Sequence, residues 1–177
     1  YQLSVIDMMV GPSDEVHLAV LHRDSLTSGD ELAPGSVSED SIAVLVLDST
    51  GNHLHMHTVF SSQNLENIGS LCSDYSGQTY LATSFLELVS FGDHELTSSG
   101  GTHVAVAQYN SGGWLWAKSA GGTGDASATD CDGRHDGGVA IVGDFLQNMT
   151  FGDLEIGPSV WVDFYEAHIS DQGEWFH

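Results

Sequence analysis

The segment HLHMHTV carries three histidines that alternate with Leu and Met. In an extended strand, side chains two residues apart point to the same face, so we expect His53, His55 and His57 to form one row. Three neutral imidazoles on one face can bind zinc or copper. These residues are therefore candidate ligands of a transition metal. The alternative is that the rings fill packing positions in a strand.

A second candidate site is the acidic segment DCDGRHDGG, in which Asp130, Asp132 and Asp136 follow a D-x-D-G-x-x-D spacing. Calcium prefers several oxygen ligands, and a glycine in the loop permits a sharp turn. The spacing resembles the calcium loop of integrin-type FG-GAP propeller repeats, although Ala128 stands where that loop has a further acid. We predict either a structural calcium ion held by these residues or an acidic hairpin turn without an ion.

The two cysteines, Cys72 and Cys131, stand at similar positions in successive copies of the repeat described below. A disulfide needs Cα atoms within about 7 Å of each other. Neighbouring copies reach that distance only close to a common axis, so we expect two free, buried thiols and keep a disulfide as the alternative. Neither cysteine lies in a local catalytic Cys–His signature. Elsewhere, Asn148 begins the glycosylation sequon Asn-Met-Thr.

The segment SDYSGQTY resembles the Asp-box hairpin of sialidase-like propellers, S-x-D-x-G-x-T-W, with Tyr75 in place of the Asp and Tyr80 in place of the Trp. Sialidase chemistry needs a cluster of arginines to hold the substrate carboxylate. Arg23 and Arg134 are the only arginines of this chain. The resemblance therefore indicates a turn and excludes that chemistry within these residues.

Composition restricts the partners. The 177 residues include 25 Asp and Glu against 3 Lys and Arg, which gives a formal net charge of −22. Such a surface repels phosphate backbones, so we expect no nucleic-acid partner. No apolar run is long enough to span a membrane, so we expect no membrane insertion. The chain begins without Met or a signal-peptide pattern and stops within a repeat, and we expect it to be a segment of a longer protein.

An internal repeat organises the chain. Gly51, Gly112 and Gly173 each close a turn and are 61 residues apart. Upstream, SFLELVSFGDHEL matches DFLQNMTFGDLEI with an offset of 60, and SLTSGDEL is a reduced copy without the Phe. The turn glycine and the segment upstream of it thus recur with nearly the same spacing. This agreement predicts one domain built from three repeats, approximately 1–60, 61–120 and 121–177.

Each repeat is expected to form four antiparallel strands. In the middle copy these are GSLCS, QTYLATSF, HVAVAQY and WLWAK, separated by turns rich in Gly, Asn, Asp and Ser. No stretch shows a helical apolar period. A repeat of this length with four strands predicts an all-β, β-propeller-like fold of three blades. Because propellers typically close with 4 to 8 blades, we expect neighbouring blades or self-association to complete it.

The middle copy, FGDHELTSSGGTHVAVAQYNSGGWLWAKSAGGTGD, resembles the SBBP-type β-propeller repeat of large secreted or surface proteins of bacteria and archaea. The family pattern has an acid before the third strand, where this chain has Ser41, His103 and Asp163. The resemblance implies a propeller fold and an extracellular or cell-surface location. It implies no catalytic residues.

Aligning the turn glycines changes the interpretation of the histidines. His53 aligns with Trp114 and Trp175, His55 with Trp116 and His177, and His57 with Lys118. Flat rings at these positions can pack between blades, which favours a packing role over a metal site. The recurrent tryptophans are likewise expected in the core, with Trp161 as the more exposed exception.

We therefore expect a non-catalytic scaffold or a module that binds a protein or glycan ligand. One alternative is a hydrolase-type enzyme with its site on the propeller axis, for which His103, Asp163, Glu166 and His168 are the positions to inspect. The other is a structural or adhesive repeat stabilised by calcium. The sequence requires no cofactor, and it favours calcium over a transition metal at the histidines.

Overall fold

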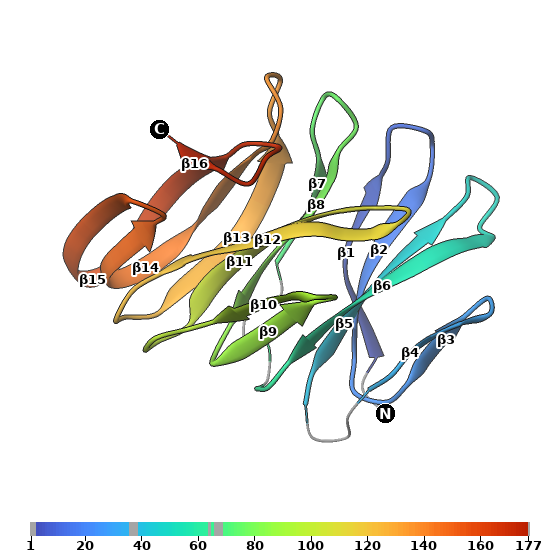
Figure 1. Ribbon diagram of the computed structural model, residues 1–177, viewed down its shortest axis with the longest axis horizontal. Helices are drawn as coiled ribbons and strands as arrows, with labels where there is room; N and C mark the ends of the chain where they lie inside the picture. Colours follow the sequence, from blue (N-terminus) through green and yellow to red (C-terminus); the bar gives the residue numbers. More distant parts are fainter. Residues whose placement is uncertain (1–2, 36–38, 64, 66–68, 177) are drawn as a thin grey trace.

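The chain folds into β-strands joined by turns (Figure 1). The computed structural model describes residues 3–35, 39–63, 65 and 69–176, and within these ranges no segment is helical. All strand pairs are antiparallel, as the sequence predicts. The alternation of apolar and polar residues between glycine-rich turns therefore produces the expected meanders.

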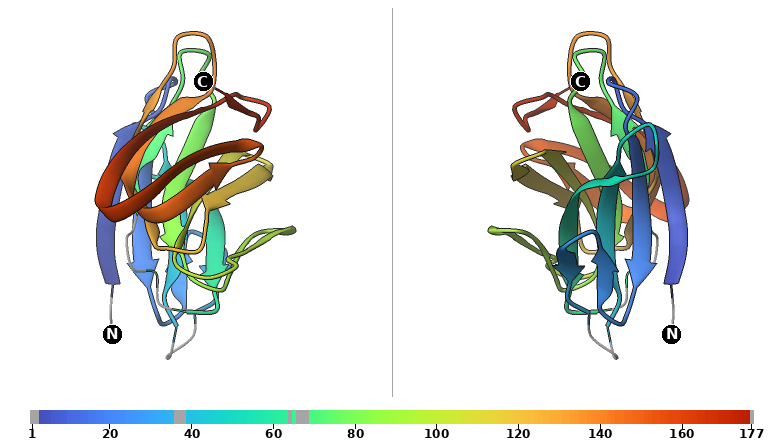
Figure 2. Two further views of the ribbon diagram at one scale, coloured as in Figure 1. Left: turned by 90° about the vertical axis from the view of Figure 1, so that its left-hand side faces the viewer. Right: turned by 90° about the vertical axis from the view of Figure 1, so that its right-hand side faces the viewer.

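The strands form three four-stranded units that stand side by side, and Figure 2 shows this stack from its two ends. Pairing between units joins them into a six-stranded and an eight-stranded sheet, with a separate two-stranded hairpin. Unit 1 contains β1 (Leu3–Val10), β2 (Val16–His22), β5 (Ser41–Leu47) and β6 (His53–Ser61). Unit 2 contains β7 (Leu71–Ser73), β8 (Thr79–Phe85), β11 (His103–Asn110) and β12 (Gly113–Gly121). Unit 3 contains β13 (Ala126–Gly133), β14 (Val139–Phe151), β15 (Leu154–Ile169) and β16 (Trp175–Phe176).

A hairpin is inserted between the second and third strands of each unit. It consists of β3 (Leu26–Ser28) and β4 (Glu31–Ala33) in unit 1, and of β9 (Leu88–Phe91) and β10 (His94–Thr97) in unit 2. In unit 3 the paired ends of β14 and β15 form it. β9 pairs with β6 of unit 1, and the end of β14 pairs with β12 of unit 2. The hairpins of units 2 and 3 therefore extend the sheet of the preceding unit.

The Phe-Gly pair of the repeat is explained by the tip of this hairpin. Gly92 and Gly152 have φ values of 57° and 60°, a region that glycine adopts without strain. A Cβ atom on them would lie 3.4 and 3.5 Å from the indole rings of Trp114 and Trp175. The recurrent tryptophan thus packs on the recurrent turn glycine.

Two hydrophobic cores lie between the units. The first joins unit 1 to unit 2 and contains Ile42, Val44, Leu81 and Phe85 among its buried residues. The second joins unit 2 to unit 3 and includes Tyr80, Val104, Ile141 and Ile169. Each unit therefore buries its apolar side chains against its neighbour rather than within its own single sheet.

Trp114 and Trp116 on β12 connect unit 2 to both neighbours. Trp114 donates its Nε1 hydrogen to the Thr58 carbonyl of unit 1 at 3.1 Å. Trp116 donates to the Asp171 carbonyl of unit 3 at 3.0 Å. A β-bulge at Leu115, between the two tryptophans, turns them to opposite faces. The expected core role of these rings is confirmed.

The described strands do not close into a barrel or a ring. Across the same ranges, we find no helix that combines the length and the apolar character needed to cross a membrane. The outward faces of units 1 and 3 consequently remain the two open ends of the stack, as Figure 2 shows.

Candidate functional site

The three histidines of HLHMHTV lie on β6, but a β-bulge interrupts their row. Leu47 pairs with His53, whereas Val46 pairs with His55. Because Leu47 and Val46 are consecutive, they point to opposite faces, and so do their partners. His53 faces away from unit 2, whereas His55 and His57 face unit 2. The prediction of one row is wrong because the bulge inserts an extra residue.

His53 packs under the hairpin of its own unit. Its Nε2 atom lies 3.7 Å from Glu31 Oε2, and Gly29 at the hairpin tip sits against the ring. His53 pairs with Leu47 as Trp114 pairs with Tyr109, which agrees with the aligned repeat positions. The ring therefore takes the place of an indole in unit 1.

A different set of histidines meets between units 1 and 2. The His55 and His57 rings are 5.0 Å apart between centroids, and the His57 ring is 5.4 Å from that of Tyr109. His17 on β2 joins them through a hydrogen bond of 2.8 Å between its Nδ1 and the Tyr109 hydroxyl. Sequence reasoning missed His17, although its pairing with Val46 places it on the face that carries His55.

Burial keeps this cluster uncharged. Burial lowers the pKa of the His57 imidazole from 6.5 to about 4, with a smaller contribution from His55. Burial also lowers the pKa of His17 and of His55, against the opposing pull of Glu15 on both. The pKa of the Tyr109 phenol is raised by burial. At neutral pH the cluster therefore presents neutral imidazoles and a protonated phenol.

A cavity of about 340 Å³ opens beside this cluster, between the turns of units 1 and 2. We call it the histidine pocket, and its polar lining comprises Ser13, Glu15, His17, His55, Gln78, Thr79, Tyr109, Asn110 and Ser111. These groups can donate and accept several hydrogen bonds around a single carboxylate. The arrangement suits a polar, uncharged ligand in a cleft between packed sheets.

No three His, Cys, Asp or Glu side chains within the described ranges are grouped so that they could hold a metal ion. Asp130 and Asp132 each accept a hydrogen bond of 2.9 Å from the N–H of the following residue. Asp136 instead pairs with Arg134 at 2.7 Å, a hydrogen bond that lowers the pKa of its carboxyl group. The calcium interpretation of these three residues stays a prediction that requires them to rearrange.

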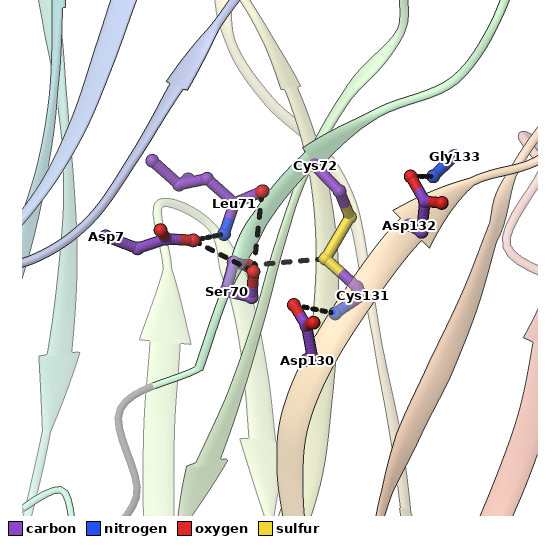
Figure 3. Close-up of a disulfide and its surroundings, with 8 residues drawn as sticks. All are labelled: Asp7, Ser70, Leu71, Cys72, Asp130, Cys131, Asp132 and Gly133. Atoms are coloured by element: carbon purple, nitrogen blue, oxygen red, sulfur yellow. Dashed lines mark hydrogen bonds between the residues drawn. A yellow bond between two sulfur atoms is a disulfide. The ribbon is translucent and has the colours of Figure 1, made fainter.

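Cys72 and Cys131 form a disulfide between β7 and β13, with Cα atoms 5.9 Å apart (Figure 3). The expectation of two free thiols is wrong. Cys72 pairs with Tyr80, and Cys131 pairs with Ile141. Both partners belong to the core between units 2 and 3, so the two sulfurs face each other across it. The bridge ties together the first strands of the two units.

The turn in SDYSGQTY is folded by Asp74 rather than by the Tyr75 position. Asp74 Oδ1 accepts hydrogen bonds from the N–H groups of Ser76 and Gln78. Its Oδ2 accepts the Tyr80 hydroxyl at 2.8 Å and, across the interface, the Gly138 N–H at 3.0 Å. Burial raises the pKa of this carboxyl group, but the hydrogen bonds outweigh burial and lower it. The turn therefore links unit 2 to unit 3.

The four positions named for an axial enzyme site do not meet. Glu166 Oε1 lies 3.0 Å from His168 Nε2, and Arg134 donates to His168 Nδ1 at 3.1 Å. His103 is buried in unit 2 and bonds a backbone carbonyl. Asp163 accepts the N–H of its own neighbour. Only Glu166 and His168 are brought together, and Arg134, which the sequence did not place there, completes their hydrogen bonds.

Two further sequence features lie on the hairpin of unit 3. Trp161 is 82 % exposed, which confirms its exception from the packed tryptophans. Asn148 of the sequon donates its Nδ2 hydrogen to Glu155 at 2.5 Å. His177, which aligned with His55, lies outside the described residues. Phe176 pairs with His168 as Trp116 pairs with Gln108, so Phe176 takes that position.

The sequence matches no model of a known protein family, and no curated protein matches it.

Proposed function

We propose that the chain is a segment of a β-propeller of the secreted or cell-surface class, and that it acts as a non-catalytic scaffold and ligand-binding module. The observation that carries the proposal is the repeated mode of packing. Three four-stranded meanders stack face to face, and the hairpins of units 2 and 3 each extend the sheet of the preceding unit. Radial repetition of such sheets is the architecture of propeller blades.

The disulfide supports an oxidising location. Disulfides persist in secreted and surface proteins, whereas cytosolic thiols are kept reduced. The bond between Cys72 and Cys131 joins two neighbouring units. The net charge of −22 also suits an exposed, strongly hydrated surface.

The histidine pocket is the proposed ligand site. Its neutral imidazoles, amides and hydroxyls offer hydrogen bonds in several directions, as the hydroxyl groups of a glycan require. Glu15 supplies the carboxylate at its edge. A ligand bound here would contact units 1 and 2 at once and so depend on their packing.

A glycan array with the purified chain tests this proposal. We expect binding of neutral glycans that Glu15→Gln and His55→Ala each weaken at least about tenfold, the loss of one or two good hydrogen bonds. Glu95→Gln removes an exposed carboxylate from the hairpin of unit 2 and is the matched control. If neither pocket variant weakens binding, the ligand site lies elsewhere on the chain.

One contact favours the hydrolase alternative, namely the pair formed by Glu166 and His168 beside a cavity of about 300 Å³. Such a pair can transfer protons in catalysis. Sustained turnover of a glycan or ester substrate that is lost in Glu166→Gln would replace the non-catalytic proposal by this one. Turnover unaffected by Glu166→Gln would count against both the pair and the non-catalytic role.

A further inference from the structure

The outward face of unit 1 is apolar, and β1 is its exposed part, whereas the hairpin of β3 and β4 lies over β6. We call it the N-face. Leu3, Val5, Met8 and Val10 on β1 are between 59 and 64 % exposed. The registers of β1, β2, β5 and β6 place no Asp, Glu, Lys or Arg from their described residues on this face. In a chain with 25 acidic residues, four strands that place none on one side of their sheet require an explanation.

Unit 2 shows what covers a face of this kind. Ala105 and Ala107 of β11 hold the positions that Ala43 and Leu45 hold in unit 1, counted from the paired strand ends. Both alanines are fully buried in the core against unit 1. Ala43 and Leu45 are already 0 and 8 % exposed, so the open part of the N-face is the row on β1. The shared registers give the N-face the arrangement of a surface that packs on the outward face of another unit.

The outward face of unit 3, the C-face, carries the opposite half of such an interface. Val142 and Phe164 are 43 and 83 % exposed. Their registers match those of Ala82 and Val104 in unit 2, which are fully buried against unit 3. Two apolar positions that bind the following unit inside the molecule are thus open on the C-face.

Two carboxylates on the C-face stand where the internal interfaces use hydrogen-bond acceptors. Asp130 occupies the strand position in unit 3 that Asp7 occupies in unit 1, and Asp7 Oδ2 accepts the N–H of Leu71 at 2.7 Å. Asp144 occupies the position that Ser84 occupies in unit 2, and Ser84 Oγ accepts the N–H of Ala128 at 2.9 Å. Both internal donors lie at or next to the first strand of the following unit. The C-face therefore carries two acceptors for backbone N–H groups of a first strand.

We propose that the N-face of one copy of this chain packs on the C-face of a second copy, so that β1 takes the place of a following first strand. The inference rests on the proposed stacking of propeller units. Charge favours this orientation, because two C-faces would oppose Asp130 and Asp144 across the interface, whereas β1, β2, β5 and β6 place no carboxylate on the N-face. The carboxylate of the overlying hairpin, Glu31, lies beside His53 at 3.7 Å. Two copies of three units give six, within the 4 to 8 blades of closed propellers.

One further carboxylate on the C-face, Glu166, is partly neutralised before association. Glu166 is hydrogen-bonded to His168, which in turn accepts a hydrogen bond from Arg134. The guanidinium also stacks on the Phe176 ring, with its Cζ atom 4.9 Å from the centroid. This network reduces the cost of burying the C-face.

Sedimentation velocity of the intact chain at rising concentration tests the proposal. We expect a head-to-tail dimer that Val5→Asp on the N-face and Phe164→Asp on the C-face each reduce to monomer. Tyr75→Asp replaces a residue that is 78 % exposed in a turn, away from both faces, and is the matched control that stays dimeric. Circular dichroism confirms that each variant is folded, and Val5→Ser and Phe164→Ser serve if an aspartate prevents folding.

Mixing the two variants identifies the orientation. The Val5→Asp chain keeps its C-face and the Phe164→Asp chain keeps its N-face, so an equimolar mixture should regain a dimer through one intact interface. Dimers that Phe164→Asp leaves unchanged would show packing between two N-faces and overturn the proposal. A monomer at every concentration would also overturn it, while the glycan-array result would still decide the proposed function.

Discussion

Replacing His57 by Phe is expected to remove part of the acid sensitivity of this protein. The His57 side chain lies between units 1 and 2, is 8 % exposed, and has an Nε2 atom without a hydrogen-bond partner. Its ring contacts His55, Tyr109 and Trp114. Phe retains a flat ring in this aromatic cluster and removes the group that takes up a proton.

The sign and size of the effect follow from the pKa of His57, which is 6.5 when unfolded and about 4 when folded. The unfolded chain binds the proton more readily, so stability is complete above pH 6.5 and is lost as the pH falls from 6.5 towards 4. Between about pH 7.5 and pH 5 the loss amounts to about 2 kcal/mol in the free energy of unfolding. The lowered pKa values of His17 and His55 add losses of the same sign.

Urea unfolding followed by tryptophan fluorescence at these two pH values measures the difference. We expect the wild-type chain to lose about 2 kcal/mol more than His57→Phe over this interval. His135→Phe replaces an exposed histidine and should keep the wild-type pH dependence. Equal losses in wild type and His57→Phe would refute the reasoning that a buried neutral imidazole causes the acid sensitivity.

Three further outcomes are expected. Replacing Cys72 and Cys131 by Ser should lower the free energy of unfolding by about 4 kcal/mol in urea titrations, because the bond closes a loop with a sequence separation of 59, and thiol labelling of the unreduced chain should find no free cysteine. Trp116→Ala should cost about 3 kcal/mol and speed hydrogen exchange in β16, whereas equal exchange would contradict its link to unit 3. The calcium prediction for the Asp130 segment requires a higher melting temperature in excess calcium than in chelator. Identical melting curves would show that these residues bind no stabilising calcium ion.

The arrangement of strands was accessible from sequence because its signals are local. Turn glycines such as Gly112 and the Phe-Gly tip at Gly92 recur at nearly constant spacing, and alternation between them indicates strands. Strand β11, predicted as HVAVAQY, extends from His103 to Asn110. The equivalence of His53 with Trp114 also followed from the repeat, and the strand registers agree with it.

The sequence did not predict in the same way which face of its sheet each side chain occupies. Val46 pairs with His55 and Leu47 pairs with His53, so one extra residue, Leu54, stands in β6 between the two histidines. One extra residue reverses the face of everything beyond it, and only the partner strand shows where it lies. This is why the sequence grouped His53 with His55, whereas the structure separates them.

The disulfide was missed for the same physical reason. Asp74 and Arg134 begin equivalent turns 60 residues apart, whereas the cysteines are 59 apart. Cys131 therefore stands one position off the equivalent of Cys72 and points to the opposite face of its sheet. Two cysteines at identical repeat positions would point the same way, and the shift by one lets these two face each other.

The sequence by itself determined the repeat, the antiparallel all-β class and the excess of acidic charge, because each depends on local pattern or composition. Only the tertiary structure decided which units share a core, that His17 joins His55 and His57 around Tyr109, and that the cysteines bridge two first strands. These contacts join residues from different repeats. Their existence depends on register and on the packing of one sheet against another, which no single stretch of sequence contains.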